Sequence, residues 1–279
     1  MRKELILPVT ATVGGAAGFF LRRTELATAF EPGTGLPIDG TPVTWALIAL
    51  SAAVAVAVLL LCLGTGKGFR GGYDEAFQAR NAVPYMAGMT VGALLTAAGG
   101  VLMLLQLPGL YAEASLASLE TGGFPMFNLV PMALLSVLCL VSAWSVLMLG
   151  RNNYRGQGRG KYSAHLLLPA YTCCMWLIVS YQEHSGDPII LDYVYQLFAV
   201  IAAVLGCYFL SGFGFGRGRP AAAAAFSAEA MYFALVTLAD THEPAFLLLY
   251  AGYFFYFAAS TVALLFNLGR PLGPRMPGT

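Results

Sequence analysis

Long apolar stretches separated by short polar segments dominate the chain. Each stretch holds about the 20 residues that an α-helix needs to cross the hydrocarbon core of a bilayer. The alternating pattern of a membrane β-barrel is not seen along them, so helices are the expected spanning elements. The predicted spans are Leu5–Leu21, Val43–Gly64, Val83–Leu107, Pro125–Leu149, Ala164–Gln182, Ile189–Gly212, Ala221–Ala239 and Pro244–Leu268. The sequence therefore predicts an all-α integral membrane protein, a bundle of about eight transmembrane helices.

The segments between the spans are too short to fold on their own. The two longest, Arg22–Pro42 and Thr65–Ala82, are well below the roughly 50 residues of a small domain. We therefore expect residues 1–279 to form a single polytopic membrane domain. The spans also group into four helical hairpins, each with a proline near its start and a Gly- and Arg-rich segment at its end. This pattern indicates either a repeat of hairpins, as some transporters use, or the ends that every membrane hairpin needs.

Composition supports the membrane class and excludes others. The chain is 58% hydrophobic and 10% charged, whereas about 25% of the residues in a soluble domain are charged. The lipid bilayer is therefore an expected partner. The net charge is +1 and no basic tract is present, so we expect no binding of nucleic acid.

The basic residues predict an orientation. Of the 15 Lys and Arg residues, 13 fall at the termini or in the segments on the same side of the membrane as the termini. The exceptions are Arg22 and Arg23, at the end of the first predicted span. No Lys or Arg is expected within a span. Because basic residues accumulate on the cytoplasmic side, we expect a multi-pass protein of the plasma membrane with both termini in the cytoplasm.

The N-terminus allows a second interpretation. Arg2 and Lys3 precede an apolar stretch, and the segment Ala27–Ala29 could serve as a signal-peptide cleavage site. Cleavage would leave seven spans. Arg22, Arg23 and Glu25 interrupt the approach to that site and favour retention of the first span.

One acidic residue in a predicted span is the strongest indication of function. Glu229 lies about midway along the seventh span, and carboxylates at such depth usually face a cavity and belong to a transport pathway. Tyr250, Tyr253 and Tyr256 lie on the eighth span at a similar level. Aromatic rings with a carboxylate can bind a substrate cation. In the alternative interpretation, the rings only pack and a tyrosine hydroxyl bonds to a neutral Glu229.

A second candidate site lies on the turns after the fifth and seventh spans. Clustered carboxylates raise the local concentration of cations, so these turns are predicted to form an outer cation-attracting rim. Two histidines in the set could instead share a metal ion, but neither turn has the spacing of a metal site. We therefore predict no metal and no cofactor. The residues of the predicted rim are Glu183, His184, Asp187, Asp240, His242 and Glu243.

Two spans carry pairs of glycines spaced four residues apart. Gly14 and Gly18 lie in the first span, and Gly88 and Gly92 lie in the third. Small residues at this spacing let helix backbones approach closely. The glycines are expected either to pack the bundle internally or to dock a membrane partner protein or a second copy of the chain.

These patterns support three hypotheses of function, which we rank from the best to the least supported. The leading hypothesis is a small-solute transporter, or the membrane subunit of one, in which Glu229 binds a cation or couples transport. The alternative is a structural or regulatory membrane subunit that docks through the glycine-rich helix faces. A membrane-embedded enzyme is the third, because no nucleophile–base pair or metal motif lies at one depth.

Overall fold

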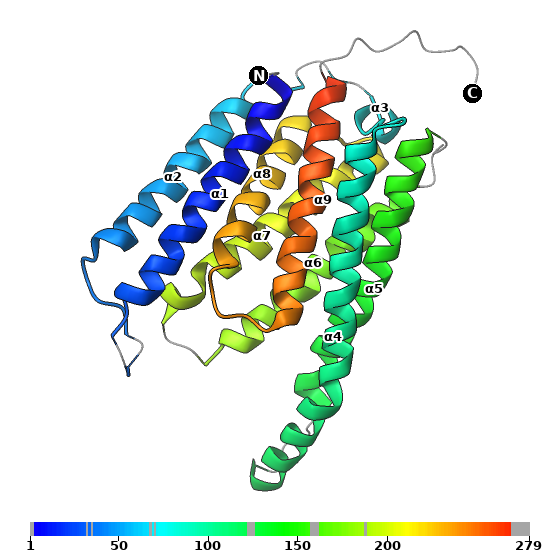
Figure 1. Cartoon of the computed structure of the whole chain (residues 1–279). Helices are drawn as coiled ribbons and strands as arrows, with labels where there is room; N and C mark the ends of the chain where they lie inside the picture. The colour runs from blue at the N-terminus through cyan, green and yellow to red at the C-terminus, as the bar shows by residue number, and fades with distance from the viewer. Residues whose placement is uncertain are drawn as a thin grey trace, which may run out of the picture.

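The computed structural model is a bundle of long helices (Figure 1). It describes residues 3–31, 33–34, 36–66, 69, 71–121, 126–156, 162–186 and 189–268. The helices are α1 (Lys3–Thr28), α2 (Pro42–Cys62), α3 (Tyr73–Ala76), α4 (Val83–Thr121), α5 (Met126–Arg155), α6 (Ser163–His184), α7 (Ile190–Gly212), the short 3₁₀ helix η1 (Phe213–Phe215), α8 (Pro220–Thr237) and α9 (Pro244–Leu268).

Eight of the described helices are long and apolar enough to cross a membrane. The prediction of an all-α multi-pass membrane protein is thus confirmed. Large apolar side chains such as Trp45, Leu60 and Trp144 are exposed on the outside of the bundle. So much exposed apolar surface is rare on a water-soluble monomer, and it indicates a lipid environment.

The spanning helices begin largely where the sequence predicts, because proline marks several starts. Pro42 and Pro220 occupy the first turns of α2 and α8, and α9 begins at Pro244. Proline suits the first turn of a helix, where its missing N–H would have no partner within the helix. Prolines inside spans, such as Pro8 and Pro169, are accommodated within α1 and α6.

Three helices, α1, α4 and α5, run well past the ends predicted for their spans, and α5 continues from Leu149 to Arg155. The first span was predicted to stop at Leu21, but α1 continues to Thr28, because Arg22 and Glu25 pair with each other and do not terminate the helix. The third was predicted to stop at Leu107, but α4 continues through Pro108 to Thr121. Arg22 and Arg23 lie within the apolar helix segment Leu5–Thr28, and Arg151 and Arg155 lie at the end of the segment Leu129–Arg155.

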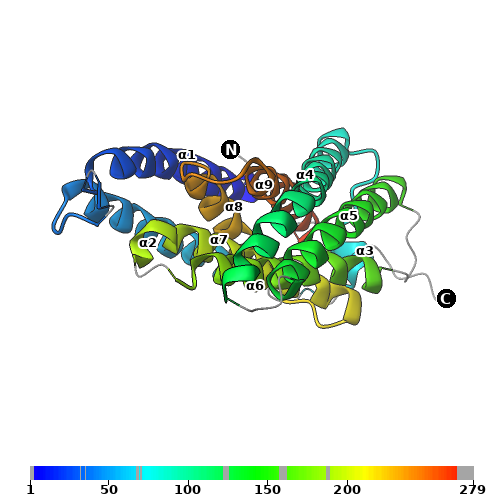
Figure 2. The ribbon, with the colours of Figure 1, turned by 90° about the horizontal axis from the view of Figure 1, so that it is seen from below.

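Six helices close into a ring around an interior of side chains. Each of α4, α5, α6, α7, α8 and α9 packs against its neighbours in the order α4–α5–α6–α7–α8–α9, and α9 packs back on α4. The hairpin of α1 and α2 lies outside this ring, where α1 packs on α8 (Figure 2). Side chains of α6 and α9 meet across the interior, where Trp176 contacts Tyr250 and Tyr253.

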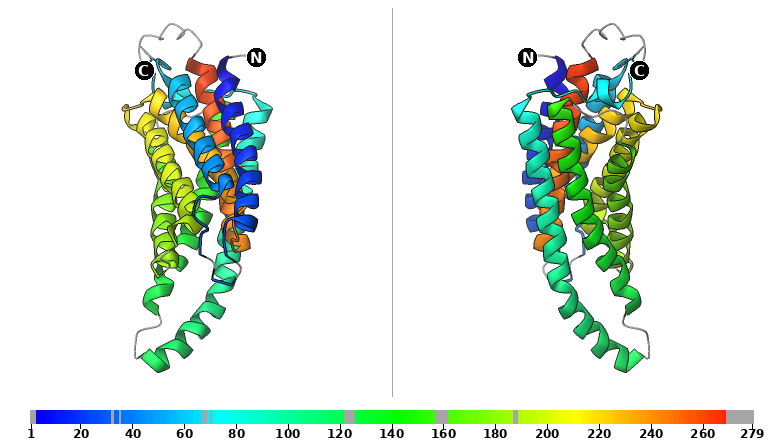
Figure 3. Two further views of the ribbon diagram at one scale, coloured as in Figure 1. Left: turned by 90° about the vertical axis from the view of Figure 1, so that its left-hand side faces the viewer. Right: turned by 90° about the vertical axis from the view of Figure 1, so that its right-hand side faces the viewer.

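The two ends of the bundle differ. Helix α1 begins and α9 ends at the same end (Figure 1), which is expected for an even number of spans. The opposite end carries the α1–α2, α6–α7 and α8–α9 connections, and we call it the outer end, following the orientation that the basic residues predict. At the outer end α4 and α5 run on past the other helices (Figure 3).

Candidate functional site

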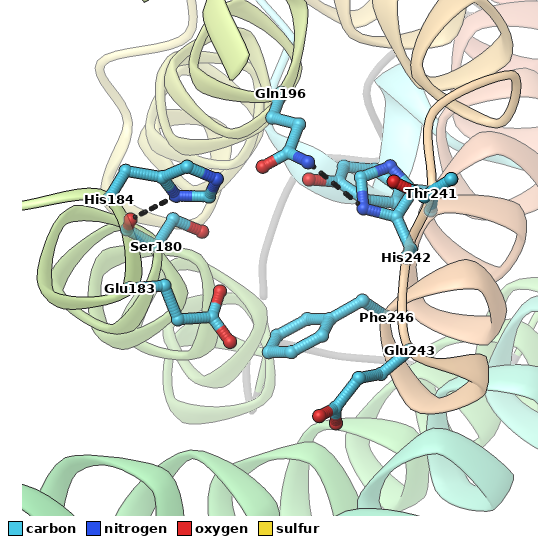
Figure 4. A pocket seen from close by; sticks show the side chains of 9 residues that line it. Ser180, Glu183, His184, Gln196, Thr241, His242, Glu243 and Phe246 are labelled. Atoms are coloured by element: carbon cyan, nitrogen blue, oxygen red, sulfur yellow. Dashed lines mark hydrogen bonds between the residues drawn. The ribbon is translucent and has the colours of Figure 1, made fainter. Parts of the chain in front are cut away.

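A polar pocket of about 180 Å³ opens at the outer end of the ring. Its wall comes from the end of α6, one residue of α7, the α8–α9 turn and the first turns of α9 (Figure 4). The lining residues are Ser180, Glu183, His184, Gln196, Thr241, His242, Glu243, Phe246 and Tyr250. We call this site the outer pocket.

The structure brings four residues of the predicted outer rim to this one pocket. Glu183 and His184 come from α6, and His242 and Glu243 come from the α8–α9 turn. Of the other two, Asp240 lies in a buried cluster beside the pocket, whereas Asp187 lies outside the described residues. The sequence pattern found these residues because both turns are rich in polar groups, but it did not show that the turns converge.

His242 is held as a neutral imidazole. Its Nε2 lies 2.7 Å from the carbonyl oxygen of Thr237, to which it donates, and its Nδ1 accepts from Gln196 Nε2 at 3.0 Å. This pattern requires a proton on Nε2 alone. Burial, together with the nearby His184 and Arg22, lowers the pKa of His242 to about 4. At neutral pH the His242 ring therefore carries no positive charge.

His184 lines the pocket from α6, across from His242 (Figure 4). Its Nδ1 donates to the carbonyl oxygen of Ser180 at 2.9 Å, and its ring lies tilted against Tyr193 with 4.4 Å between the centroids. Among the described residues, no three His, Cys, Asp or Glu side chains come together in a way that could hold a metal ion.

Two carboxyl groups give the pocket its acidic character. Glu183 on α6 points toward the ring of Phe246, and Glu243 on the α8–α9 turn lies on the other side of that ring (Figure 4). The floor is the ring of Tyr250, which contacts His242 and Trp176. No Lys or Arg is among the described lining residues. Acidic groups above an aromatic floor are suited to a small cation.

A buried ionic cluster lies next to the pocket, and sequence reasoning missed it. Arg22 is 0% exposed and bonds to Asp240 Oδ1 through Nε at 2.6 Å and to Glu25 Oε2 through Nη1 at 2.7 Å. It also donates to the carbonyl oxygens of Leu191 and Asp192 and lies over the ring of Tyr195. The i, i+3 spacing of Arg22 and Glu25 was the available signal.

This cluster holds one basic and two acidic side chains, Arg22, Glu25 and Asp240. Burial raises the pKa of Asp240, while Arg22 and the Thr237 hydroxyl favour its ionised form. The Thr237 hydroxyl donates to Asp240 Oδ2 at 2.8 Å and also lies 3.1 Å from His242 Nε2. Arg22 on α1 is thereby linked through Asp240 and Thr237 to a wall of the outer pocket.

Beneath the pocket, aromatic side chains fill the interior of the ring. Tyr250 contacts Trp176, and Trp176 contacts Tyr253. Tyr253 in turn contacts Tyr256, and its hydroxyl donates to the carbonyl oxygen of Pro169 at 3.1 Å. We call these four residues the aromatic column. Trp176 Nε1 is buried without a hydrogen-bond partner, so the column contains one unused donor.

Glu229 lies neither in the outer pocket nor in the aromatic column. It shares a helix face with Tyr232 and Val236, which pack against Gly14 and Gly18 of α1. Its Oε2 is buried without a hydrogen-bond partner. The structure therefore places Glu229 between α8 and the α1–α2 hairpin, whereas the hydroxyl of Tyr253 bonds across the ring interior.

The four predicted glycines lie where helices approach each other. A Cβ atom on Gly14 would lie 2.8 Å from a Val54 methyl group, and one on Gly18 would lie 2.6 Å from a Val236 methyl group. In α4, Gly88 packs on Ala259, and a Cβ on Gly92 would lie 2.9 Å from the carbonyl oxygen of Gly252. All four glycines thus face neighbours within the same chain.

Comparison with known proteins assigns no function. No protein-family profile matches the chain, and no similar curated protein or solved structure was found.

Proposed function

We propose that the protein is a small-solute transporter, or the membrane subunit of one, whose outer pocket admits a small organic cation. The observation that carries this proposal is the pair Glu183 and Glu243, which line the same pocket as the buried ring of Tyr250. Carboxylates raise the local concentration of cations, and an aromatic face binds an ammonium group. The neutral state of His242 removes a repulsive charge from the same wall.

The size of the pocket suits a compact solute. Its volume of about 180 Å³ is close to the roughly 150 Å³ of a cavity that accepts benzene. The aromatic column continues inward from the floor, and Tyr250, Trp176 and Tyr253 are all buried. In this proposal the described conformation is closed below the pocket, and the column must separate for the solute to pass.

Glu229 is the proposed coupling carboxylate. Its Oε2 has no hydrogen-bond partner, and it lies where α8 packs on the α1–α2 hairpin. Another face of α8 packs on α7, where a Cβ on Gly206 would lie 3.5 Å from the backbone nitrogen of Ser227. Gain or loss of a proton or a cation at Glu229 would therefore change the packing of a helix that also borders the pathway.

The outer pocket is tested by binding and flux. We expect tetramethylammonium or choline to raise the melting temperature of the purified protein. We also expect proteoliposomes that contain the protein to take up either cation across their membrane. Glu183→Gln with Glu243→Gln should abolish both effects. The control is Glu113→Gln, which removes an exposed carboxylate of α4 outside the pocket. Equal loss in the control, or equal binding of acetate, would contradict a cation site.

The role of Glu229 is tested separately. Glu229→Gln keeps the size of the side chain, so we expect wild-type thermal stability together with loss of coupled flux. Glu229→Lys should prevent stable assembly, because a lysine in the middle of a span costs roughly 3 kcal/mol on insertion scales. Wild-type flux in Glu229→Gln would reduce Glu229 to a packing residue and leave the outer pocket as the remaining support for transport.

A second candidate function is favoured by the projecting part of α4. This helix has 39 residues, which corresponds to about 58 Å at about 1.5 Å per residue, well beyond the roughly 30 Å hydrocarbon core. Tyr111 and Leu116 are exposed on the projection. A membrane subunit would use it to contact a partner. Co-purification of one protein with the wild type, lost in Tyr111→Asp with Leu116→Asp, would favour this function.

A further inference from the structure

A second cavity lies at the end of the bundle opposite the outer pocket. It has a volume of about 440 Å³ and runs between α6, the last turns of α7 and the segment that leads to α8. Leu167, Tyr208, Phe209 and Phe215 form its apolar part, and Arg217 and Arg219 stand at its polar end. We call this cavity the arginine groove.

The local backbone places the two arginines at the groove. Helix α7 tightens into η1, and Gly216 then turns the chain with a φ of 68°. Side chains rarely adopt this left-handed conformation, and glycine does so without steric cost. The N–H of Arg217 closes the turn by donating to the carbonyl oxygen of Gly212 at 2.9 Å. The apolar wall and the basic end therefore lie side by side.

Arg217 and Arg219 form no ion pair with a described residue. Both ion pairs in the described part of the chain belong to Arg22 at the outer end. Arg217 and Arg219 are exposed and follow directly after the spanning segment Ile190–Phe215. Their guanidinium groups thus lie at the depth of the lipid headgroups, where a phosphate can accept two parallel hydrogen bonds from one guanidinium.

The apolar part of the groove is open to the side of the bundle. Tyr208 is 64% exposed and Phe215 is 52% exposed, and Tyr208 lies deeper in the membrane than the arginines. A ligand that fills the groove must combine an anionic group at the surface with a hydrocarbon chain that runs inward. A free phosphate would leave the apolar wall uncovered.

We infer that the arginine groove binds an anionic phospholipid, with its phosphate at Arg217 and Arg219 and one acyl chain along Leu167 and Tyr208. Basic pockets between transmembrane helices are known to hold anionic headgroups. The lipid would pack against α6 and α7, which also form walls of the outer pocket. The inference does not depend on the proposed transport.

Native mass spectrometry of the detergent-purified full chain tests this site. Phosphatidylglycerol and phosphatidylcholine with identical acyl chains are titrated in parallel. We expect phosphatidylglycerol to be retained at least tenfold more strongly, and we expect this preference to disappear in Arg217→Gln with Arg219→Gln. The matched control is Arg151→Gln with Arg155→Gln, which removes two exposed basic residues from the last turns of α5.

Three outcomes would overturn the inference. Equal loss of the preference in the α5 control would indicate diffuse attraction to basic charge. Displacement of the lipid by millimolar inorganic phosphate would indicate a site for a soluble anion. Undiminished retention in Leu167→Trp, which keeps both arginines but fills the apolar part of the groove, would show that no acyl chain lies there. Reduced retention in that variant supports the lipid site.

Discussion

At the scale of single residues, Arg22 is the clearest example of a buried charge that needs partners from several parts of the fold. The guanidinium group, with five N–H groups and one positive charge, is out of contact with solvent. Two carboxylates and two carbonyl oxygens accept its hydrogen bonds, and it lies over an aromatic ring. These partners come from α1, α7 and the α8–α9 turn. A side chain paired in this way cannot be removed without leaving buried charges behind.

We therefore expect Arg22→Gln to be strongly destabilising. Breaking a buried ion pair by removal of one partner costs roughly 3–5 kcal/mol, and here Asp240 and Glu25 would both lose their partner. Thermal unfolding in detergent measures the change. The control is Arg23→Gln, because Arg23 is exposed on the same helix turn. Similar melting temperatures for the two variants would show that the buried cluster does not stabilise the fold.

His242 makes stability depend on pH. Its pKa of about 4 in the folded protein lies below the ordinary value of 6.5, so the unfolded chain binds more protons between these values. We expect stability to fall as the pH is lowered from about 6.5 toward 4. His242→Gln should remove this part of the pH dependence in thermal unfolding, whereas the opposing contribution of Asp240 remains in both proteins. An unchanged profile would mean that His242 titrates normally.

At the scale of helices, close approach of α4 and α9 depends on facing glycines. Gly92 and Gly252 meet so closely that a Cβ on Gly92 would lie 2.9 Å from one backbone oxygen and 3.1 Å from the backbone nitrogen of Tyr256. Backbone atoms cannot move aside as the end of a flexible side chain can. The two helices must therefore separate if the glycine is replaced.

Gly92→Ala should accordingly destabilise the bundle by roughly 1–3 kcal/mol, the usual cost of an overpacked core. Gly109→Ala is the matched control, because Gly109 lies in the same helix and a Cβ there would meet no atom within 4 Å. Alanine favours helix formation over glycine, so the control should keep or slightly raise the melting temperature. A drop of the same size in both variants would contradict the packing role of Gly92.

At the scale of the whole molecule, the orientation in the membrane decides which side of the membrane each site faces. The outer pocket and the arginine groove lie at opposite ends of the bundle, so one faces each side of the membrane. The distribution of basic residues predicts that the termini are cytoplasmic. The outer pocket would then receive its solute from outside the cell.

Cysteine labelling on intact cells tests this orientation. In a background without the native cysteines, Asp39→Cys on the exposed α1–α2 connection should react with a membrane-impermeant thiol reagent. Arg151→Cys, exposed near the end of α5, should react only after the cells are opened. Reaction of the α5 cysteine alone on intact cells would invert the orientation and place the outer pocket in the cytoplasm.

The sequence by itself determined the class of the protein and the positions of its spanning helices. Insertion of a helix depends on the local density of apolar residues, and proline marks helix starts through its own missing N–H, so both can be read from neighbouring residues. Helix α1 continues past Leu21 and α4 continues past Leu107, the ends predicted for their spans. In the folded bundle Arg22 is paired, and Pro108 is accommodated within α4.

Only the tertiary structure decided which polar groups meet. Arg22 and Asp240 are 218 residues apart in the chain, and no local pattern relates them. The outer pocket needs α6, α7 and the α8–α9 turn to converge, and Glu229 turns toward α1 and α2 through the rotation of α8 in its packing. These pairings depend on the free energy of burying charged groups among several helices at once. The sequence around any one residue does not determine that free energy.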